Sequence, residues 1–336
     1  MKILLGAGTS YFFVIPISIN NILPYRVNSK NKTRYVSIYN KRYIKKLSYN
    51  LPSNIGLSAV VKNQKNNKII DFQAIQRLNA GDLFFPYLVG LIEGDGWFSL
   101  TKNGKYLKYE FGIEMNIRDI QLLHKIKQNL GVGTIDIRDT DKTKRTGVLF
   151  RIRNKTHLKN IIIPILDKYP LLSNKQYDYL RFKEVLLSDT IITTDLIKYV
   201  RPKEIIKNSD KFEYINTNYF QAWLIGFIEA ESSFTTYKPS LSSSKVASFE
   251  ISQTNGYDLI EAIKFYLSLT SKIYTDKTDN SNLKVTSIRQ IENIIKFIQK
   301  APVKLMGYKK LQYLLFIKEL RQIPRYSNKI KIPQNY

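Results

Sequence analysis

Residues 86 to 100 read PYLVGLIEGDGWFSL, and residues 221 to 235 read QAWLIGFIEAESSFT. Each stretch begins with an apolar run typical of a buried helix and closes on an acid, a small residue, a second acid and another small residue. Aromatic and hydroxyl residues follow, which predict a strand. Two copies in the same order predict that the chain is built from an internal repeat.

The repeat extends beyond these two stretches. Asp95 is followed after 80 residues by Lys175, and Glu231 is followed after 78 residues by Lys309. The segments around the two lysines are similar, since both contain Lys, Tyr and Leu. Between these points each half alternates strand-like and helix-like periodicity. We therefore expect an α+β fold made of two αββαββα domains, residues 84–189 and 218–336, joined by a charged linker over 190–217.

Small residues recur at one spacing in both predicted helices. Gly90 and Gly94 are four residues apart, and the second helix repeats this spacing with Gly226 and Ala230, so each pair lies on one helical face. Without bulky side chains there, the two helices can pack closely. If they pack side by side and parallel, the acids that end the two motifs come together.

A pair of acids at two helix C-termini makes a strongly negative spot. Asp95 and Glu231 would repel each other without a hard cation, and oxygen ligands with phosphate are the usual surroundings of Mg²⁺. The absence of Cys and the presence of only two His exclude a thiol nucleophile and a His-rich metal site. We therefore expect metal-assisted phosphodiester hydrolysis. Glu93 and Glu229 lie ~200° around their helices from the paired acids, so we expect them to be structural.

The two motifs, residues 88–96 and 224–232, resemble the two copies of the LAGLIDADG motif. The similarity covers residues 84–336 and is strongest to single-chain proteins encoded in group I introns of fungal mitochondrial apocytochrome b genes. It implies a pseudo-two-fold pair of domains whose antiparallel sheets form a saddle over nucleic acid. It also implies a Mg²⁺ or Mn²⁺ cofactor.

The resemblance assigns roles to particular residues. The implied catalytic residues are Asp95, Glu231, Lys175, Lys309 and Gln253, and the implied metal-binding residues are Asp95, Glu231, Gly94 and Ala230. The lysines would face the water around the scissile phosphate, and the amide would orient the attacking water. Two departures leave cleavage open, because Met115 stands where the first half would match Gln253, and Ser232 replaces the Gly that closes the motif.

The charge of the chain points to a polyanionic partner. Lys and Arg number 53 against 27 Asp and Glu, which gives a net charge of +26. On the predicted saddle we expect a set of basic side chains to contact nucleic acid: Lys102, Lys105, Lys108, Arg138, Lys142, Lys144, Arg145, Arg151 and Arg153 in the first half, and Lys238, Lys245, Lys272, Lys277 and Lys284 in the second.

Residues 1–83 form an N-terminal extension of different composition. Residues 1–70 hold twelve Lys or Arg and no Asp or Glu. The apolar stretch from Ile3 to Ile19 is interrupted by Gly and Pro and falls short of the ~20 residues of a membrane span, which favours a buried extension or a targeting remnant. The basic, Tyr-rich segment from Tyr25 to Tyr49 could bind phosphates and stack on bases, or be an arm with no fixed role.

Two functions fit this combination. We expect a maturase of the mitochondrial matrix, a non-catalytic cofactor in the splicing of its host group I intron RNA, with a Mg²⁺-dependent homing endonuclease activity as a further role. The alternative is a homing endonuclease alone, which cuts double-stranded DNA of the intronless allele. The expected state is a monomer with pseudo-two-fold symmetry and a nuclear-encoded splicing helper, and spread-out charge argues against a membrane partner.

Overall fold

The computed structural model describes residues 23–29, 32–38, 83–104, 106–138, 146–188, 199–202, 213–240 and 244–334. Contacts divide the chain into one unit of residues 1–80 and a second unit of residues 81–336. In the first unit, β1 (Leu23–Ser29) pairs antiparallel with β2 (Lys32–Ile38). The apolar stretch from Ile3 to Ile19 and the side chains of the basic segment lie outside the described residues.

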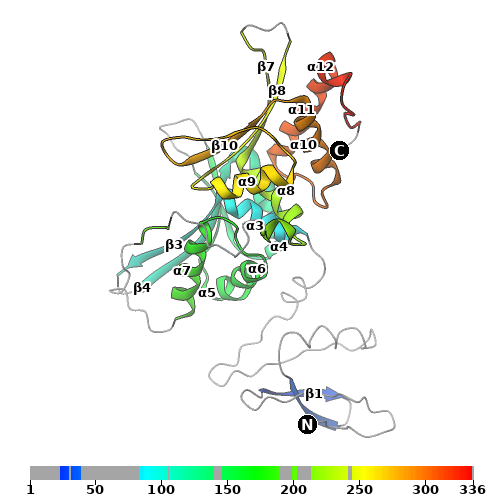
Figure 1. Cartoon of the computed structure of the whole chain (residues 1–336). Coiled ribbons are helices and arrows are strands. Elements are labelled where there is room, and N and C mark those ends of the chain that lie inside the picture. Colours follow the sequence, from blue (N-terminus) through cyan, green and yellow to red (C-terminus); the bar gives the residue numbers. More distant parts are fainter. Residues whose placement is uncertain are drawn as a thin grey trace. The chain divides into compact units, whose positions relative to one another are not determined.

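The first half of the second unit alternates helices with strand pairs (Figure 1). Its elements are α3 (Phe84–Asp95), β3 (Gly96–Asn103), β4 (Tyr106–Asn116), η1 (Ile117–Asp119), α4 (Ile120–Leu130), β5 (Thr134–Arg138), β6 (Gly147–Ile152), α5 (Lys155–His157), η2 (Leu158–Ile162), α6 (Ile163–Lys168) and α7 (Lys175–Leu187).

The second half repeats this order of elements. It contains η4 (Glu213–Asn216), α8 (Phe220–Glu231), β7 (Ser232–Tyr237), β8 (Val246–Thr254), α9 (Tyr257–Tyr266), β9 (Ile273–Thr275), β10 (Asn280–Val285), α10 (Ile288–Lys300), α11 (Tyr308–Gln322) and α12 (Pro324–Ser327). The helix predicted to close each half is two helices, α6 and α7 or α10 and α11, and the later member carries the predicted lysine.

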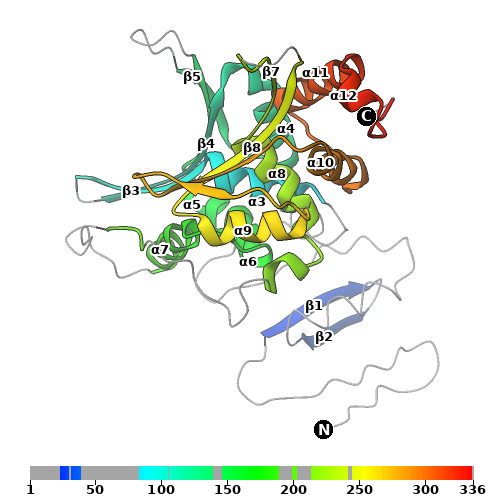
Figure 2. The ribbon, with the colours of Figure 1, turned by 45° about the horizontal axis from the view of Figure 1, so that its top comes forward.

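The two antiparallel sheets have the same strand order, β3-β4-β6-β5 and β7-β8-β10-β9, which confirms the α+β fold and its pseudo-two-fold repeat. Helices cover one face of each sheet (Figure 2). In the first half, Phe98 on that face packs against Phe111 and against Phe182 of α7, with ring centroids 5.6 and 5.5 Å apart. Because side chains alternate along a strand, the next residues point to the other face, which we call the open face.

The two halves share a core through α3 and α8, whose backbones touch. A Cβ atom at Gly90 would lie 1.9 Å from the carbonyl oxygen of Trp223, and one at Gly226 would lie 1.9 Å from that of Tyr87. A Cβ at Gly94 would lie 2.4 Å from Cβ of Ala230, so the helices run parallel with their C-terminal ends together. This packing joins residues 81–336 into one compact unit. None of the helices in the described ranges is both long and apolar enough to cross a membrane.

Candidate active site and nucleic-acid interface

Asp95 and Glu231 are the last residues of α3 and α8, and the parallel packing of these helices brings them together. A Cβ at the neighbouring Gly94 would lie 2.9 Å from Cγ and Oε1 of Glu231. Burial, and then the negative charge of Glu231, raise the pKa of Asp95 to about 7. Burial also raises the pKa of Glu231. The pair predicted from the sequence is therefore a compact, partly buried acidic site where the two halves meet.

Lys175 opens α7 and reaches the end of α3. Its Nζ donates to the carbonyl oxygens of Ile92 (3.0 Å), Gly94 (2.9 Å) and Gly96 (2.8 Å). These carbonyls include helix-end acceptors, which a cation satisfies well. The side chain is 6% exposed, and burial lowers its pKa. The predicted lysine thus lies beside Asp95, clamped by three backbone oxygens.

Lys309 occupies the matching place at the start of α11 but is held differently. Its Nζ donates to the carbonyl oxygen of Ser232, the residue that corresponds to Gly96. The hydroxyl of Ser232 donates to the carbonyl oxygen of Ile228 at 2.6 Å, the acceptor that corresponds to the Ile92 carbonyl bound by Lys175. Ser232 therefore fits the fold, and it takes one of the acceptors that a symmetric Lys309 would use.

Glu93 and Glu229 are structural, as predicted. Glu93 is fully buried and accepts from the backbone N–H groups of Leu172 (2.7 Å) and Ser173 (3.1 Å), just before α7. Glu229 accepts from the N–H groups of Met306 (2.7 Å) and Gly307 (3.2 Å), just before α11, and from the hydroxyl of Tyr87 (3.0 Å). Each inner acid therefore fixes the loop that presents its half's lysine.

Gln253 and Met115 occupy matching positions at the ends of β8 and β4, each four residues after the Phe that pairs with the first strand of its half. The amide oxygen of Gln253 is buried and has no hydrogen-bond partner in the described part of the chain. An unpartnered buried acceptor is costly, which makes it suited to binding a water. Met115 offers a thioether at the equivalent place, so only the second half has such an acceptor.

The donor set fits a hard divalent cation in part. Two carboxylates beside backbone oxygens and a phosphate suit Mg²⁺ or Mn²⁺. Within the described ranges, no three His, Cys, Asp or Glu side chains lie close enough to hold a metal ion, so the paired acids would need oxygen ligands from elsewhere. The carbonyl of Gly94 already accepts from Lys175, which limits its availability.

The open face of the first sheet carries alternating basic and acidic side chains. Arg151 pairs with Asp136 at 2.5 Å, and Arg138 pairs with Glu114 at 3.4 Å. Glu110 pairs with Arg153 and, at 3.8 Å, with Lys108. Four predicted nucleic-acid contacts therefore lie together on this face, and acids not singled out from the sequence pre-orient them.

The open face of the second sheet is largely uncharged. Lys284 lies there, with Nζ 2.6 Å from Glu250 and 5.3 Å from the ring centroid of Tyr237. Strand alternation surrounds it with hydroxyl and amide side chains that the charge-based search missed, namely Ser233, Thr235, Ser252, Thr254, Asn280 and Asn282. Their signal was present in the sequence as polar residues with period two.

Several predicted contacts are not on these faces. Lys102 falls on the same side of β3 as Phe98, because the two are four residues apart, so alternation removes it from the open face. Lys245 pairs with Glu319 of α11 at 3.3 Å, on the helix side. Lys238, Lys272 and Lys277 are exposed next to the ends of β7 and β9. Outside the described residues lie Lys105, Lys142, Lys144 and Arg145.

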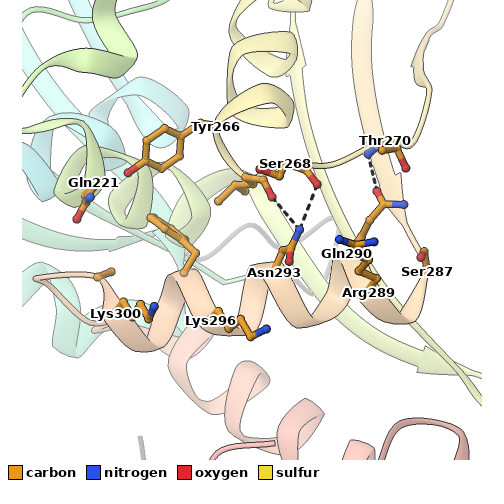
Figure 3. Close-up of a pocket in the computed structure, with 13 residues that line it drawn as sticks. Gln221, Tyr266, Ser268, Thr270, Ser287, Arg289, Gln290, Asn293, Lys296 and Lys300 are labelled. Atoms are coloured by element: carbon orange, nitrogen blue, oxygen red, sulfur yellow. Dashed lines mark hydrogen bonds between the residues drawn. The ribbon is translucent and has the colours of Figure 1, made fainter. Parts of the chain in front are cut away.

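A separate pocket lies between α10 and the loop after α9 (Figure 3). Its central amides are already used, because Asn293 donates to the carbonyl of Ser268 at 3.1 Å and Gln290 accepts from the N–H of Thr270 at 2.9 Å. Lys296 pairs with Glu292 at 2.9 Å. The polar groups hold the loop to the helix, so the pocket has a structural explanation.

Comparisons with known proteins agree with this geometry. Residues 88–186 and 224–320, more than half of the chain, match the family described as LAGLIDADG endonuclease. The probable intron-encoded endonuclease Cox1-I1b of Schizosaccharomyces pombe is 30% identical over 258 residues, 71% of this chain and 64% of that protein. The intron-encoded RNA maturase bI4 of Saccharomyces cerevisiae is 27% identical over 209 residues, 60% of this chain and 26% of that protein.

The fold is also found in solved structures. The I-LtrWI LAGLIDADG homing endonuclease bound to target DNA is 25% identical, with a TM-score of 0.56 over 74% of this chain and 95% of that one. The chain spans less than two thirds of the length of the two curated relatives named above.

Proposed function

This chain belongs to the LAGLIDADG endonuclease family, and we propose that it is an intron-encoded endonuclease that cuts double-stranded DNA at a specific site. The observation that carries this proposal is the meeting of Asp95 and Glu231 at the ends of two touching helices, with Lys175 and Lys309 beside them. Such an arrangement would stabilise a phosphate and a metal ion at the point where the two halves meet.

Each group has a defined task in this proposal. Asp95 and Glu231 would hold Mg²⁺ or Mn²⁺, which when bound supplies Lewis-acid chemistry for phosphodiester hydrolysis. Lys175 and Lys309 would stabilise negative charge on the phosphate, and the unpaired amide oxygen of Gln253 would orient a water. The Lys and Arg side chains of the open faces would bind the DNA backbone, and the neighbouring polar groups would contact bases.

A second proposed function is that of an RNA maturase for the host group I intron. Two observations favour it: the similarity to the maturase bI4, and a strongly basic N-terminal extension without a single acid in residues 1–70. RNA recognition by shape needs no intact cleavage centre. From the sequence we expected the maturase to be the main function. The intact acid pair now gives the endonuclease at least equal support.

We place both activities in the mitochondrial matrix. Lys makes up most of the basic residues, and Asn, Ile, Tyr and Phe are abundant, as expected for an AT-rich organellar gene. The pseudo-two-fold unit of residues 81–336 contains both acids and both lysines, so a monomer suffices for the proposed site. A nuclear-encoded helper in splicing remains part of the maturase proposal.

The test compares the full chain with Asp95→Asn and Glu231→Gln on two substrates, each with Mg²⁺. With intronless target DNA, we expect the wild type to make a double-strand break and each variant to lose at least ~10³-fold in rate, because one carboxylate cannot hold the ion. With unspliced intron RNA, we expect splicing to be unchanged in both variants. Intact DNA with every protein would refute the endonuclease, and loss of splicing in the variants would refute separate functions.

A matched pair of variants tests the basic extension. Replacing Arg26, Lys30, Lys32 and Arg34 with Gln should weaken RNA binding and flatten its dependence on salt, because each lost phosphate contact removes released counterions. The control replaces Arg325, Lys318, Lys329 and Lys331 near the C-terminus. An equal change in both variants would mean that only net charge matters.

A further inference from the structure

The turn after β4, η1, belongs to the first half but contacts α11 of the second half. Asp119, the last residue of η1, accepts a hydrogen bond from the backbone N–H of Tyr308 through Oδ1 at 2.7 Å. Tyr308 is the first residue of α11 and directly precedes Lys309. The contact joins residues 189 positions apart and crosses between the halves.

Two neighbours show that this contact is closely fitted. The guanidinium of Arg118 lies over the ring of Tyr308, 5.0 Å from its centroid. A Cβ atom at Gly307 would lie only 2.4 Å from Oδ1 of Asp119 and 2.9 Å from Cδ2 of Leu122. The backbone of Gly307 is extended, so glycine is needed there for space and not for its φ angle.

Asp119 acts as an N-cap supplied from another part of the chain. The first N–H groups of a helix lack partners within it, and a carboxylate near them is favourable. The N-cap residue of α11 is Gly307, which has no side chain to cap the helix. Asp119 supplies the missing acceptor, and Glu229 binds the two preceding N–H groups.

This anchor matters because Lys309 has weaker local support than Lys175. Lys175 is clamped by three carbonyls, whereas Lys309 has one, with a neighbouring acceptor taken by Ser232. The place of the Lys309 ammonium therefore depends on where α11 begins. Asp119 fixes that point one residue away.

We propose that Asp119, aided by Arg118, is a positioning residue for Lys309, so that the first half controls the lysine of the second. This rests on the proposed endonuclease function. The pseudo-two-fold axis relates the two lysines as a DNA dyad relates the two strands, so each lysine serves one strand. Asp119 therefore governs cleavage of the strand served by Lys309.

The contacts of Asp119 favour this role over that of a metal ligand. Its Oδ1 is occupied by the Tyr308 N–H, and no three acidic or His side chains in the described part of the chain form a metal site. A ligand would affect both strands through the shared ion. A positioning residue affects one.

The test measures nicking of each DNA strand separately, with the two strands labelled differently. Lys309→Met first identifies the strand that depends on Lys309. Asp119→Ala should slow cleavage of that same strand about 3- to 10-fold, no more than Lys309→Met itself, and leave the other strand and DNA affinity unchanged, because a displaced group loses rate and not binding. Asp119→Asn should restore most of the rate, since its amide oxygen can still accept from Tyr308. Glu292→Ala, an acid paired only on α10, is the control.

The outcomes separate this inference from the proposed function. Equal slowing of both strands, or no slowing of either, would overturn the positioning role. If the wild type cuts no DNA, the endonuclease proposal fails, and amide hydrogen exchange then tests the anchor itself. We expect exchange at the start of α11 to rise at least 10-fold in Asp119→Ala but not in Glu292→Ala, and unchanged exchange would overturn the inference.

Discussion

The two halves of the second unit share one backbone plan and differ in how they hold their lysines. Lys175 is buried and binds three carbonyls, whereas Lys309 is half-buried and binds one. The change from Gly96 to Ser232 accounts for part of this difference, because the Ser232 hydroxyl takes the carbonyl of Ile228. Backbone contact between the helices keeps the halves symmetric, while side chains one layer away are free to diverge.

The open faces differ in the same way. The first sheet presents arginines and lysines paired with acids, and the second presents mainly hydroxyl and amide groups around Lys284. Ion pairs at a surface contribute little to stability but pre-orient long side chains. If the proposed function holds, we expect the first face to contact mainly phosphates and the second face to make more direct contacts to bases.

We expect the contact between α3 and α8, to which both halves contribute equally, to be the most sensitive to substitution. Gly90→Ala or Gly226→Ala would put a Cβ 1.9 Å from a backbone oxygen of the other helix, so α3 and α8 must separate. We expect either variant to lower the free energy of unfolding by about 3–5 kcal/mol, measured by urea denaturation. The control is Gly104→Ala, because a Cβ at this position would meet nothing within 4 Å. Residue 104 has a φ of +60°, so this substitution should lower the free energy of unfolding by only about 1 kcal/mol. Equal costs would contradict the close contact.

The two lysines should differ in the next test. Lys175→Met would remove the charge and leave three carbonyls at the end of α3 without a donor, so we expect its strand to be cut about 100-fold more slowly. Lys309→Met should slow the other strand about 10-fold. Single-turnover cleavage of end-labelled DNA measures both rates. Equal losses would show that the observed asymmetry has no effect on catalysis.

Metal binding should depend on the two acids together. We expect Mg²⁺ at about ten times its Kd to stabilise the wild type by about 1–2 kcal/mol. We expect no stabilisation by Mg²⁺ of Asp95→Asn or of Glu231→Gln. The raised pKa of Asp95, about 7, means that the metal-free protein loses stability as pH rises from about 4 to 7. Mg²⁺ competes with that proton, so its effect on Tm should grow from pH 6 to pH 8. A pH-independent effect would place the ion elsewhere.

The smallest expected effect comes from making the halves alike. Ser232→Gly frees the carbonyl of Ile228 for Lys309 and should raise the cleavage rate of its strand about 3-fold, with stability changed by no more than about 1 kcal/mol. The reciprocal variant Gly96→Ser should be harmful, because its Cβ would lie 2.7 Å from Cγ2 of Ile92 and its hydroxyl would compete with Lys175. Faster cleavage by the reciprocal variant would contradict this account.

The sequence by itself determined the repeat, the α+β class and the meeting of the two acids. These features follow from local spacing, since small residues four apart mark one helical face and an acid at a fixed place ends each helix. The same spacing separated the inner acids, Glu93 and Glu229, from the paired ones. The matching positions of Met115 and Gln253 were implied by the family resemblance, and both residues lie near the ends of corresponding strands.

Only the tertiary structure decided which groups hold the site in place. The hydrogen bond between Asp119 and Tyr308 joins segments 189 residues apart. Lys175 donates to backbone oxygens, which every residue possesses. Neither interaction can therefore be predicted from a sequence pattern. The face on which Lys102 lies depends on strand register, where one residue reverses every side chain. Local patterns specify elements, but contacts between distant elements depend on how those elements pack.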